Sequence, residues 1–169
     1  KTGDEGFEWA RPRDEWQAIS LNYTSGTTGN PKGVVYHHRG SYLMSMGSVS
    51  AWNMPNRLTY LYTVPMFHCN GWGYPWTLAM LHARVVFIRN IIVKEIFDLI
   101  DLYQVTHFGG APIVLNMIAN APAEDQKALK NKVYVMTAGA PSPSSILLKM
   151  ESLGFEVIHV YGLTETYGH

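Results

Sequence analysis

The residues from Thr24 to Gly33, TSGTTGNPKG, combine three glycines with four hydroxyl side chains and a single lysine. Glycine permits positive φ angles and close approach of the backbone, so exposed amide N–H groups and hydroxyls can surround phosphate oxygens. Lys32 adds a positive charge near the end of the stretch. The pattern predicts a phosphate-binding loop, and the alternative interpretation is a surface hairpin of small polar residues.

The position of the lysine separates this loop from the common phosphate-binding loop that opens a helix. That loop has the form G-x-x-x-x-G-K-[ST], with lysine after glycine, whereas Lys32 precedes Gly33. This difference argues against a phosphate-loop NTPase. The flanking residues 21–23 and 34–38 (LNY and VVYHH) are typical of strands, so the loop is expected to join a β-hairpin.

The rest of the chain alternates between strand-like and helix-like segments. Runs rich in β-branched and aromatic residues predict strands, and stretches with apolar residues at helical spacing separate them. The expected strands span residues 58–64, 84–88, 105–109, 132–138 and 156–162. The expected helices span residues 72–82, 93–104, 112–119 and 143–153.

This alternation predicts an α/β fold with an open, mostly parallel sheet and helices on both faces, preceded by the β-hairpin. Strands joined by a helix-length connection are most simply parallel neighbours. The loops that leave parallel strands meet at the carboxyl edge, where open α/β sheets bind ligands. That edge is expected to gather four loops rich in Gly, His, Thr and Glu, at residues 65–72, 109–112, 139–143 and 162–166.

Composition narrows the class of protein. A hydrophobic content of 47% favours a globular chain, and 13 basic with 13 acidic side chains give a formal net charge of zero. Nothing in this balance favours binding to nucleic acid or to an anionic membrane surface. Cys69 is the only cysteine, and the longest apolar stretches are interrupted at Arg84, Arg89, Asn90 and Lys94. We therefore expect small molecules or other proteins as partners, no membrane span, and a cytoplasmic location.

Three stretches resemble, in their order and residue patterns, the signature segments of the adenylate-forming (AMP-binding) superfamily, in its acyl-CoA synthetase branch. They are YTSGTTGNPKG at residues 23–33, PMFHCNGW at 65–72 and VYGLTETYG at 160–168. The resemblance implies that ATP and Mg²⁺ activate a carboxylic acid to an acyl-adenylate, from which coenzyme A takes the acyl group. Short- or medium-chain fatty acids or aryl acids are the expected substrates. The alternative is a nucleotide-binding module without catalysis.

The resemblance also assigns roles to individual residues. Lys32 and Thr164 would contact phosphates, Glu165 would hold Mg²⁺, and His68 would lie near the substrate carboxylate as a gate or hydrogen-bond donor. A general-base role for His68 is not expected, because a carboxylic acid is already ionised at neutral pH. Tyr161 would stack on adenine. The residues expected to bind the nucleotide are Thr24, Ser25, Gly26, Thr27, Thr28, Gly29, Lys32, Gly139, Ala140, Pro141, Tyr161, Gly162 and Thr164.

The resemblance places the acyl pocket among five residues: His68, Trp72, Tyr74, Trp76 and Gly109. Its aromatic side chains would limit the length of the acyl chain. Aromatic residues at the start of a helix are more often part of a core, so core packing is the second interpretation for the three pocket aromatics. Core packing is likewise the alternative for Tyr161, and a solvated turn carboxylate is the alternative for Glu165.

Residues 1–18 are expected to form a polar lead-in segment, and residues 19–169 the central nucleotide-binding part of an AMP-binding domain. The resemblance implies a further N-terminal subdomain and a small C-terminal domain, whose lysine contacts the α-phosphate and the carboxylate. Neither is expected within these 169 residues. The chain is therefore interpreted as a fragment of an acid–thiol ligase that is inactive by itself.

Overall fold

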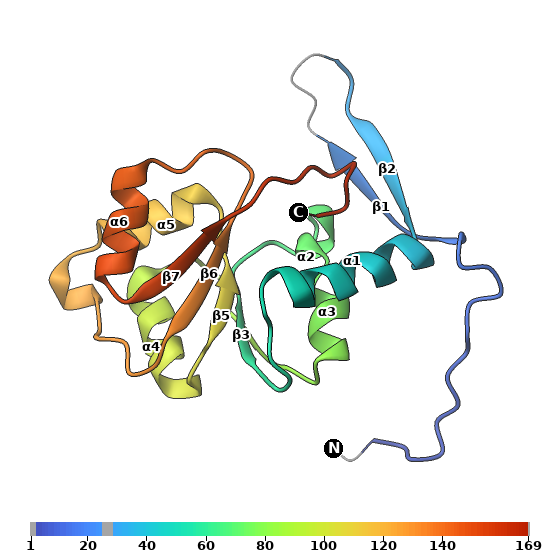
Figure 1. Ribbon diagram of the computed structural model, residues 1–169, viewed down its shortest axis with the longest axis horizontal. Coiled ribbons are helices and arrows are strands. Elements are labelled where there is room, and N and C mark those ends of the chain that lie inside the picture. Colours follow the sequence, from blue (N-terminus) through green and yellow to red (C-terminus); the bar gives the residue numbers. More distant parts are fainter. Residues whose placement is uncertain (1–2, 25–28, 169) are drawn as a thin grey trace.

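A two-stranded hairpin and a five-stranded sheet organise the chain in the computed structural model, which describes residues 3–24 and 29–168 (Figure 1). The hairpin pairs β1 (Ala18–Thr24) antiparallel to β2 (Lys32–His37), with Thr24 opposite Lys32. These two residues therefore flank the predicted phosphate-binding loop. The predicted site residues Ser25, Gly26, Thr27 and Thr28 lie outside the described residues.

The larger sheet confirms the predicted α/β fold class. Its strands are all parallel and lie in the order β4-β3-β5-β6-β7. They are β3 (Thr59–Tyr62), β4 (Arg84–Phe87), β5 (His107–Gly109), β6 (Val133–Thr137) and β7 (Phe155–His159).

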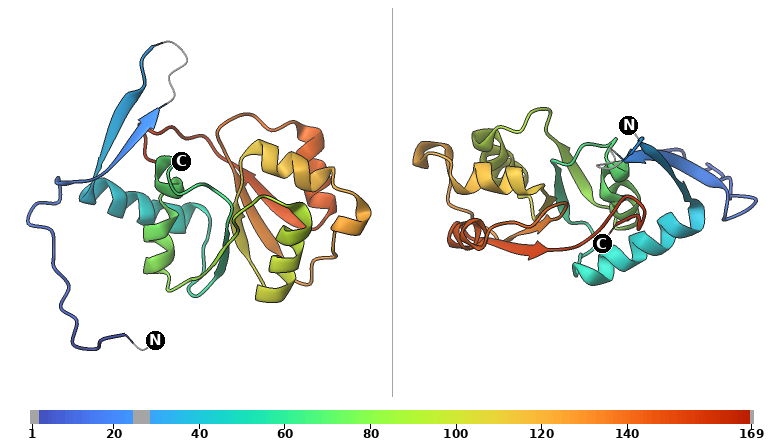
Figure 2. Two further views of the ribbon diagram at one scale, coloured as in Figure 1. Left: turned by 180° about the vertical axis from the view of Figure 1, so that it is seen from behind. Right: turned by 90° about the horizontal axis from the view of Figure 1, so that it is seen from above.

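Helices cover both faces of this sheet, as predicted (Figures 1 and 2). On one face, α4 (Val93–Tyr103), α5 (Pro112–Ala119) and α6 (Ser144–Ser152) form the larger core with side chains such as Leu61 and Val135. On the other face, α3 (Tyr74–Met80) and the segment after α1 (His38–Ala51) form a second core. A single 3₁₀ turn, η1 (Ala123–Asp125), follows α5.

The expectation that consecutive strands are neighbours is wrong for β4 and β5. β5 pairs with β3 on the side opposite β4, because α4 returns the chain across the sheet to the far side of β3. The connection from β3 to β4 runs over the face that α3 covers, and the connection from β5 to β6 runs over the opposite face. The sheet therefore has a topological switch point between β3 and β5, where open α/β sheets bind ligands.

Helix α1 was not expected from the sequence. Its buried residues are Ser41, Ser45 and Ser48, a stripe of small polar side chains, so the segment lacks the apolar period on which the prediction relied. The Ser45 hydroxyl is satisfied by donating to the carbonyl oxygen of Ser41 (2.9 Å). The strand-like run at 34–38 ends at His37, whose Nδ1 accepts from the N–H of Gly40 (3.0 Å) and caps the helix.

His107 gives the second core an expected sensitivity to acid. It is 2% exposed and lies between the rings of Trp52 and Tyr134, at centroid distances of 5.1 and 4.9 Å. Burial lowers the pKa of His107 from 6.5 to about 4. Between these pH values the imidazole is neutral in the folded protein but protonated in the unfolded chain. The free energy of unfolding is therefore expected to fall by roughly 3 kcal/mol between about pH 6.5 and about pH 4.

Denaturant unfolding of the wild type and of His107→Phe at pH 7 and pH 4.5 tests this expectation. Phenylalanine can keep the ring packing but binds no proton, so the variant should lose this part of the acid sensitivity. Equal losses of stability in the two proteins between these pH values would show that His107 is not responsible.

Candidate active site

The carboxyl ends of β3 and β5 form the floor of the candidate site at the switch point. Gly109 is buried at the end of β5 and donates its N–H to the Tyr60 hydroxyl (3.0 Å), while its carbonyl oxygen accepts from the Thr63 hydroxyl. A Cβ atom at position 109 would lie 3.0 Å from the Tyr60 hydroxyl oxygen and 3.1 Å from the Trp72 ring. The ring of Trp72 therefore covers Gly109, and these two predicted pocket residues lie together.

The segment α2 (Cys69–Trp72) is a left-handed turn and not the beginning of the predicted helix. Residues 69–73 have consecutive positive φ angles of 45°, 46°, 59°, 59° and 72°. This conformation is costly for residues other than glycine, of order 1–3 kcal/mol each, so packing must hold it in place. The regular helix α3 starts only at Tyr74. The turn places His68 at its beginning, exposed to solvent, and Trp72 at its end.

Close packing from β3 and α1 holds this turn. The Tyr62 hydroxyl donates to the carbonyl oxygen of Gly71 (2.8 Å). Burial raises the pKa of Tyr62, which keeps the hydroxyl protonated and able to donate. An added Cβ at Gly71 would overlap the Tyr62 hydroxyl, and one at Gly73 would displace the end of the Met44 side chain.

Thr164 connects the C-terminal signature segment to the hairpin and to the left-handed turn. Its carbonyl oxygen accepts a hydrogen bond from the Tyr36 hydroxyl on β2 (2.6 Å), and its Oγ1 lies 3.1 Å from Cys69 Sγ in the left-handed turn. Tyr167 adds a ring contact to Tyr36, with centroids 3.7 Å apart. Figure 1 shows the segment after β7 running back to the hairpin and α2. The hairpin, the turn and the C-terminal segment thus meet at one end of the sheet.

The remaining predicted nucleotide-binding residues lie on exposed loops. Gly139, Ala140 and Pro141 follow β6, and Gly139 has a φ of +96° that favours glycine. Tyr161 is 78% exposed, so the alternative of core packing is wrong for this residue. Gly29 and Lys32 are also exposed, at the described edges of the hairpin loop.

Glu165 borders a pocket of about 500 Å³ between β2, α1 and the C-terminal segment. Its side chain is exposed. Among the residues that the structure describes, no group of three or more His, Cys, Asp or Glu side chains is placed to hold a metal ion. A single carboxylate nevertheless suits Mg²⁺, which commonly uses one or two carboxylates and completes its coordination with water and phosphate oxygens. Glu165 therefore fits the predicted magnesium role.

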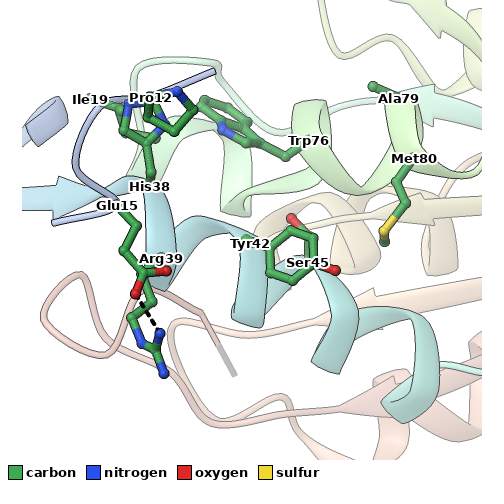
Figure 3. Close-up of a pocket in the computed structure, with 10 residues that line it drawn as sticks. All are labelled: Pro12, Glu15, Ile19, His38, Arg39, Tyr42, Ser45, Trp76, Ala79 and Met80. Atoms are coloured by element: carbon green, nitrogen blue, oxygen red, sulfur yellow. Dashed lines mark hydrogen bonds and ion pairs between the residues drawn. The ribbon is translucent and has the colours of Figure 1, made fainter. Parts of the chain in front are cut away.

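The predicted acyl-pocket aromatics do not form one cluster. Tyr74 is fully buried in the second core, where its hydroxyl donates to Met136 Sδ (3.0 Å), which favours the core interpretation for this residue. Trp76 lines a separate pocket of about 520 Å³ (Figure 3). Figure 3 shows it facing Pro12 and Ile19 across this pocket, which α1 closes on the other side. Of this predicted set, Trp72 covers Gly109 at the switch point, and the Trp72 backbone N–H donates to the carbonyl oxygen of His68 (3.4 Å).

Sequence reasoning missed the residues that bring the segments together. Tyr36 lies in the strand-like flank at 34–38 and Cys69 inside the stretch 65–72, yet their partner Thr164 is 128 and 95 residues away in the sequence. No spacing rule could pair them, because the contacts depend on how the hairpin folds against the sheet. The one signal in the sequence is a polar side chain, such as the Tyr36 hydroxyl, within an otherwise apolar, strand-like run.

The parallel sheet, with polar loops gathered at its switch point, places the chain among the open α/β domains, which bind ligands at the carboxyl ends of their strands. The family model described as AMP-binding enzyme matches residues 2–169, and the chain belongs to this family. In the described residues, no helix has both the length and the apolar character that a membrane crossing requires.

Individual relatives agree with this assignment. An acetate/butyrate–CoA ligase of Arabidopsis thaliana, described as peroxisomal, is 53% identical over 168 residues, which are 99% of this chain and 30% of that protein. The N-terminal domain of FACL13 from Mycobacterium tuberculosis, in an inhibitor-bound crystal structure, has 28% identity and a TM-score of 0.82 over 89% of this chain and 38% of that one.

A third relative is o-succinylbenzoate CoA synthetase from Bacillus subtilis, solved in complex with its acyl-adenylate intermediate. It has 25% identity and a TM-score of 0.79, covering 92% of this chain and 32% of that chain. This chain therefore spans about a third of the length of these proteins.

Proposed function

We propose that this chain is the central nucleotide-binding part of an enzyme that activates a carboxylic acid with ATP and transfers the acyl group to coenzyme A. The observation that carries the proposal is the meeting of the hairpin, the left-handed turn and Thr164 at the switch point. Membership of the AMP-binding enzyme family supports it, as do relatives named as CoA ligases. One relative has been solved with an acyl-adenylate bound, which supports this intermediate.

The proposed reaction brings two anions together. A carboxylate oxygen attacks the α-phosphorus of ATP, the bond from this phosphorus to the bridging oxygen breaks, and pyrophosphate leaves. Catalysis then depends on alignment and on groups that stabilise negative charge. Lys32 and the hairpin loop would hold the β- and γ-phosphates, and Thr164 would bind the α-phosphate. His68, exposed at the start of the turn, would donate a hydrogen bond near the carboxylate.

Glu165 is proposed to hold Mg²⁺ at the phosphates, where the ion supplies charge neutralisation. Tyr161, which is 78% exposed, would stack on adenine, and the exposed residues Gly139, Ala140 and Pro141 would form the nearby wall. These roles agree with the exposure of each side chain.

The proposed acid is short or medium in length, or aromatic. Trp72 lies over Gly109 at the switch point, so an acyl group that enters there meets a wide aromatic side chain within a short distance. The Arabidopsis relative is named for acetate and butyrate, which supports small acids. The cytoplasmic location stays a prediction, since that relative is described as peroxisomal.

Exchange of labelled pyrophosphate into ATP by the full-length enzyme tests the adenylation step. Acetate, butyrate, octanoate and benzoate are suitable acids, and formation of the acyl-CoA tests the second step. We expect exchange that depends on both the acid and Mg²⁺. Nucleotide binding in calorimetry without any exchange would identify a binding module and refute the proposed enzyme. The 169-residue chain alone is expected to show no exchange.

Replacing Lys32 with alanine is expected to lower the kcat of pyrophosphate exchange by at least about tenfold, because a positive charge at the phosphates is lost. Lys32 is exposed at the start of β2, so the substitution should leave the fold intact. Lys94→Ala is the matched control, since Lys94 is an exposed lysine on α4 that pairs with Asp98. Equal kcat values for the two variants would remove Lys32 from the proposed site.

A further inference from the structure

The left-handed turn is joined to the hairpin by a pair of asparagines that no signature role accounts for. The side-chain N–H of Asn22 donates to Asn70 Oδ1 (2.8 Å), and the backbone N–H of Asn70 donates to Asn22 Oδ1 (3.0 Å). The Ser20 hydroxyl adds a second donor to Asn70 Oδ1 (2.6 Å). The two residues are 48 positions apart in the sequence, so the pair is a tertiary contact.

Both members of the pair are held in defined surroundings. Asn22 is only 4% exposed on β1, so its amide depends on these hydrogen bonds for satisfaction. Asn70 has φ 46° and ψ 48°, a left-handed conformation that asparagine tolerates better than most residues. The pair therefore holds the turn at a residue that suits its left-handed backbone.

The elements on the two sides of the pair carry different parts of the proposed site. Two residues after Asn22, β1 ends at Thr24, where the predicted phosphate-binding loop begins. Asn70 lies two residues after His68 and two before Trp72, which are proposed to act at the carboxylate and the acyl group. The hairpin also reaches the C-terminal segment through Tyr36, which donates to the Thr164 carbonyl oxygen and contacts the Tyr167 ring. The asparagine pair is thus a direct link between the nucleotide side and the acid side.

We propose that Asn22 and Asn70 are positioning residues that set the distance and angle between the phosphate-binding hairpin and the turn carrying His68 and Trp72. This inference rests on the proposed function, because it concerns alignment of the carboxylate with the α-phosphorus of ATP. Loss of alignment by about 1 Å can lower a reaction rate on the order of a hundredfold without abolishing binding.

The test uses full-length enzyme carrying Asn22→Ala, Asn70→Gly or both substitutions. Glycine keeps the left-handed backbone at position 70 but removes the acceptor. Each single variant is expected to lower the kcat of pyrophosphate exchange by about ten- to a hundredfold, with the ATP dissociation constant changed less than about threefold. The double variant should be no worse than the poorer single variant, because the two residues act as one unit.

A conservative variant and a matched control separate positioning from general structure. Asn70→Asp keeps an oxygen that can accept from both Asn22 and Ser20, and should retain most of the kcat at saturating ATP. Asn116→Ala removes an exposed asparagine–asparagine hydrogen bond on α5, from Asn120 to Asn116 Oδ1 (3.0 Å), and should leave exchange unchanged.

The outcomes distinguish this inference from the proposed function. A wild-type enzyme without exchange refutes the proposed function itself. If the wild type is active, single variants with a kcat within twofold of the wild-type value refute positioning. A double variant whose fold-loss in kcat equals the product of the two single fold-losses refutes it as well. Variants that fail to fold in thermal unfolding, or an Asn70→Asp variant as poor as Asn70→Gly, would assign the pair a structural role instead.

Discussion

Glu165→Gln is expected to lower the kcat of acyl-adenylate formation by about a hundredfold or more in the full-length enzyme, without unfolding it. Glu165 is exposed at the edge of a pocket beside the hairpin, so the substitution buries no new group. Glutamine keeps the size of the side chain but removes the charge that attracts Mg²⁺, and one lost electrostatic contact at a reacting phosphate costs on the order of 10²–10³ in rate.

The magnesium dependence gives this prediction its specific readout. The concentration of Mg²⁺ that supports half-maximal exchange should rise in Glu165→Gln, because the ion loses a carboxylate ligand. Glu151→Gln, on the exposed surface of α6, is the matched control and should match the wild type. An unchanged Mg²⁺ requirement in Glu165→Gln would favour the interpretation of Glu165 as a solvated turn carboxylate.

Gly71→Ala is expected to have the largest effect on stability. Gly71 has φ +59°, and an added Cβ would overlap the Tyr62 hydroxyl that donates to its carbonyl oxygen. The positive φ costs alanine about 1–2 kcal/mol, and a buried hydroxyl without its partner costs about 1–3 kcal/mol more. The melting temperature should therefore fall by on the order of 10 °C. Activity should fall as well, because the turn carries His68 and Trp72.

Thermal unfolding of Gly71→Ala and Gly47→Ala tests whether the site requires glycine at position 71. Gly47 lies within α1, and a Cβ there would meet no atom within 4 Å. Alanine at position 47 should leave the protein equally stable or stabilise it by up to about 1 kcal/mol, because alanine favours a helix. A Gly71→Ala variant as stable as the Gly47→Ala variant would show that the turn can relax around a side chain.

The strands and most helices could be predicted because they depend on local pattern. Runs such as residues 132–138 predicted β6 almost to its observed bounds, Val133–Thr137, since a strand buried on both faces is a continuous apolar run. The helix expected at 93–104 is α4, Val93–Tyr103, whose apolar spacing matches one buried face. Helix α1 was not predicted because its buried residues are serines, and a search for apolar residues at helical spacing does not detect them.

The order of the strands could not be predicted in the same way. Local pattern does not say on which side of β3 the strand after α4 will pair, and this choice places the switch point between β3 and β5. The prediction of the acyl-pocket residues differs most from the observed structure. Trp72 and Trp76 are four residues apart, yet the left-handed turn between Cys69 and Gly73 directs one to Gly109 and leaves the other in a separate pocket.

The sequence by itself determined the fold class, the glycine-rich hairpin and the signature stretches around Lys32, His68 and Thr164, because each depends on residue types at short spacing. Only the tertiary structure decided that Tyr36 and Cys69 both contact Thr164, and that Asn22 is hydrogen-bonded to Asn70. The physical reason is that these contacts join residues 48 to 128 positions apart. Their geometry follows from the strand order and from a backbone turn that most residues avoid.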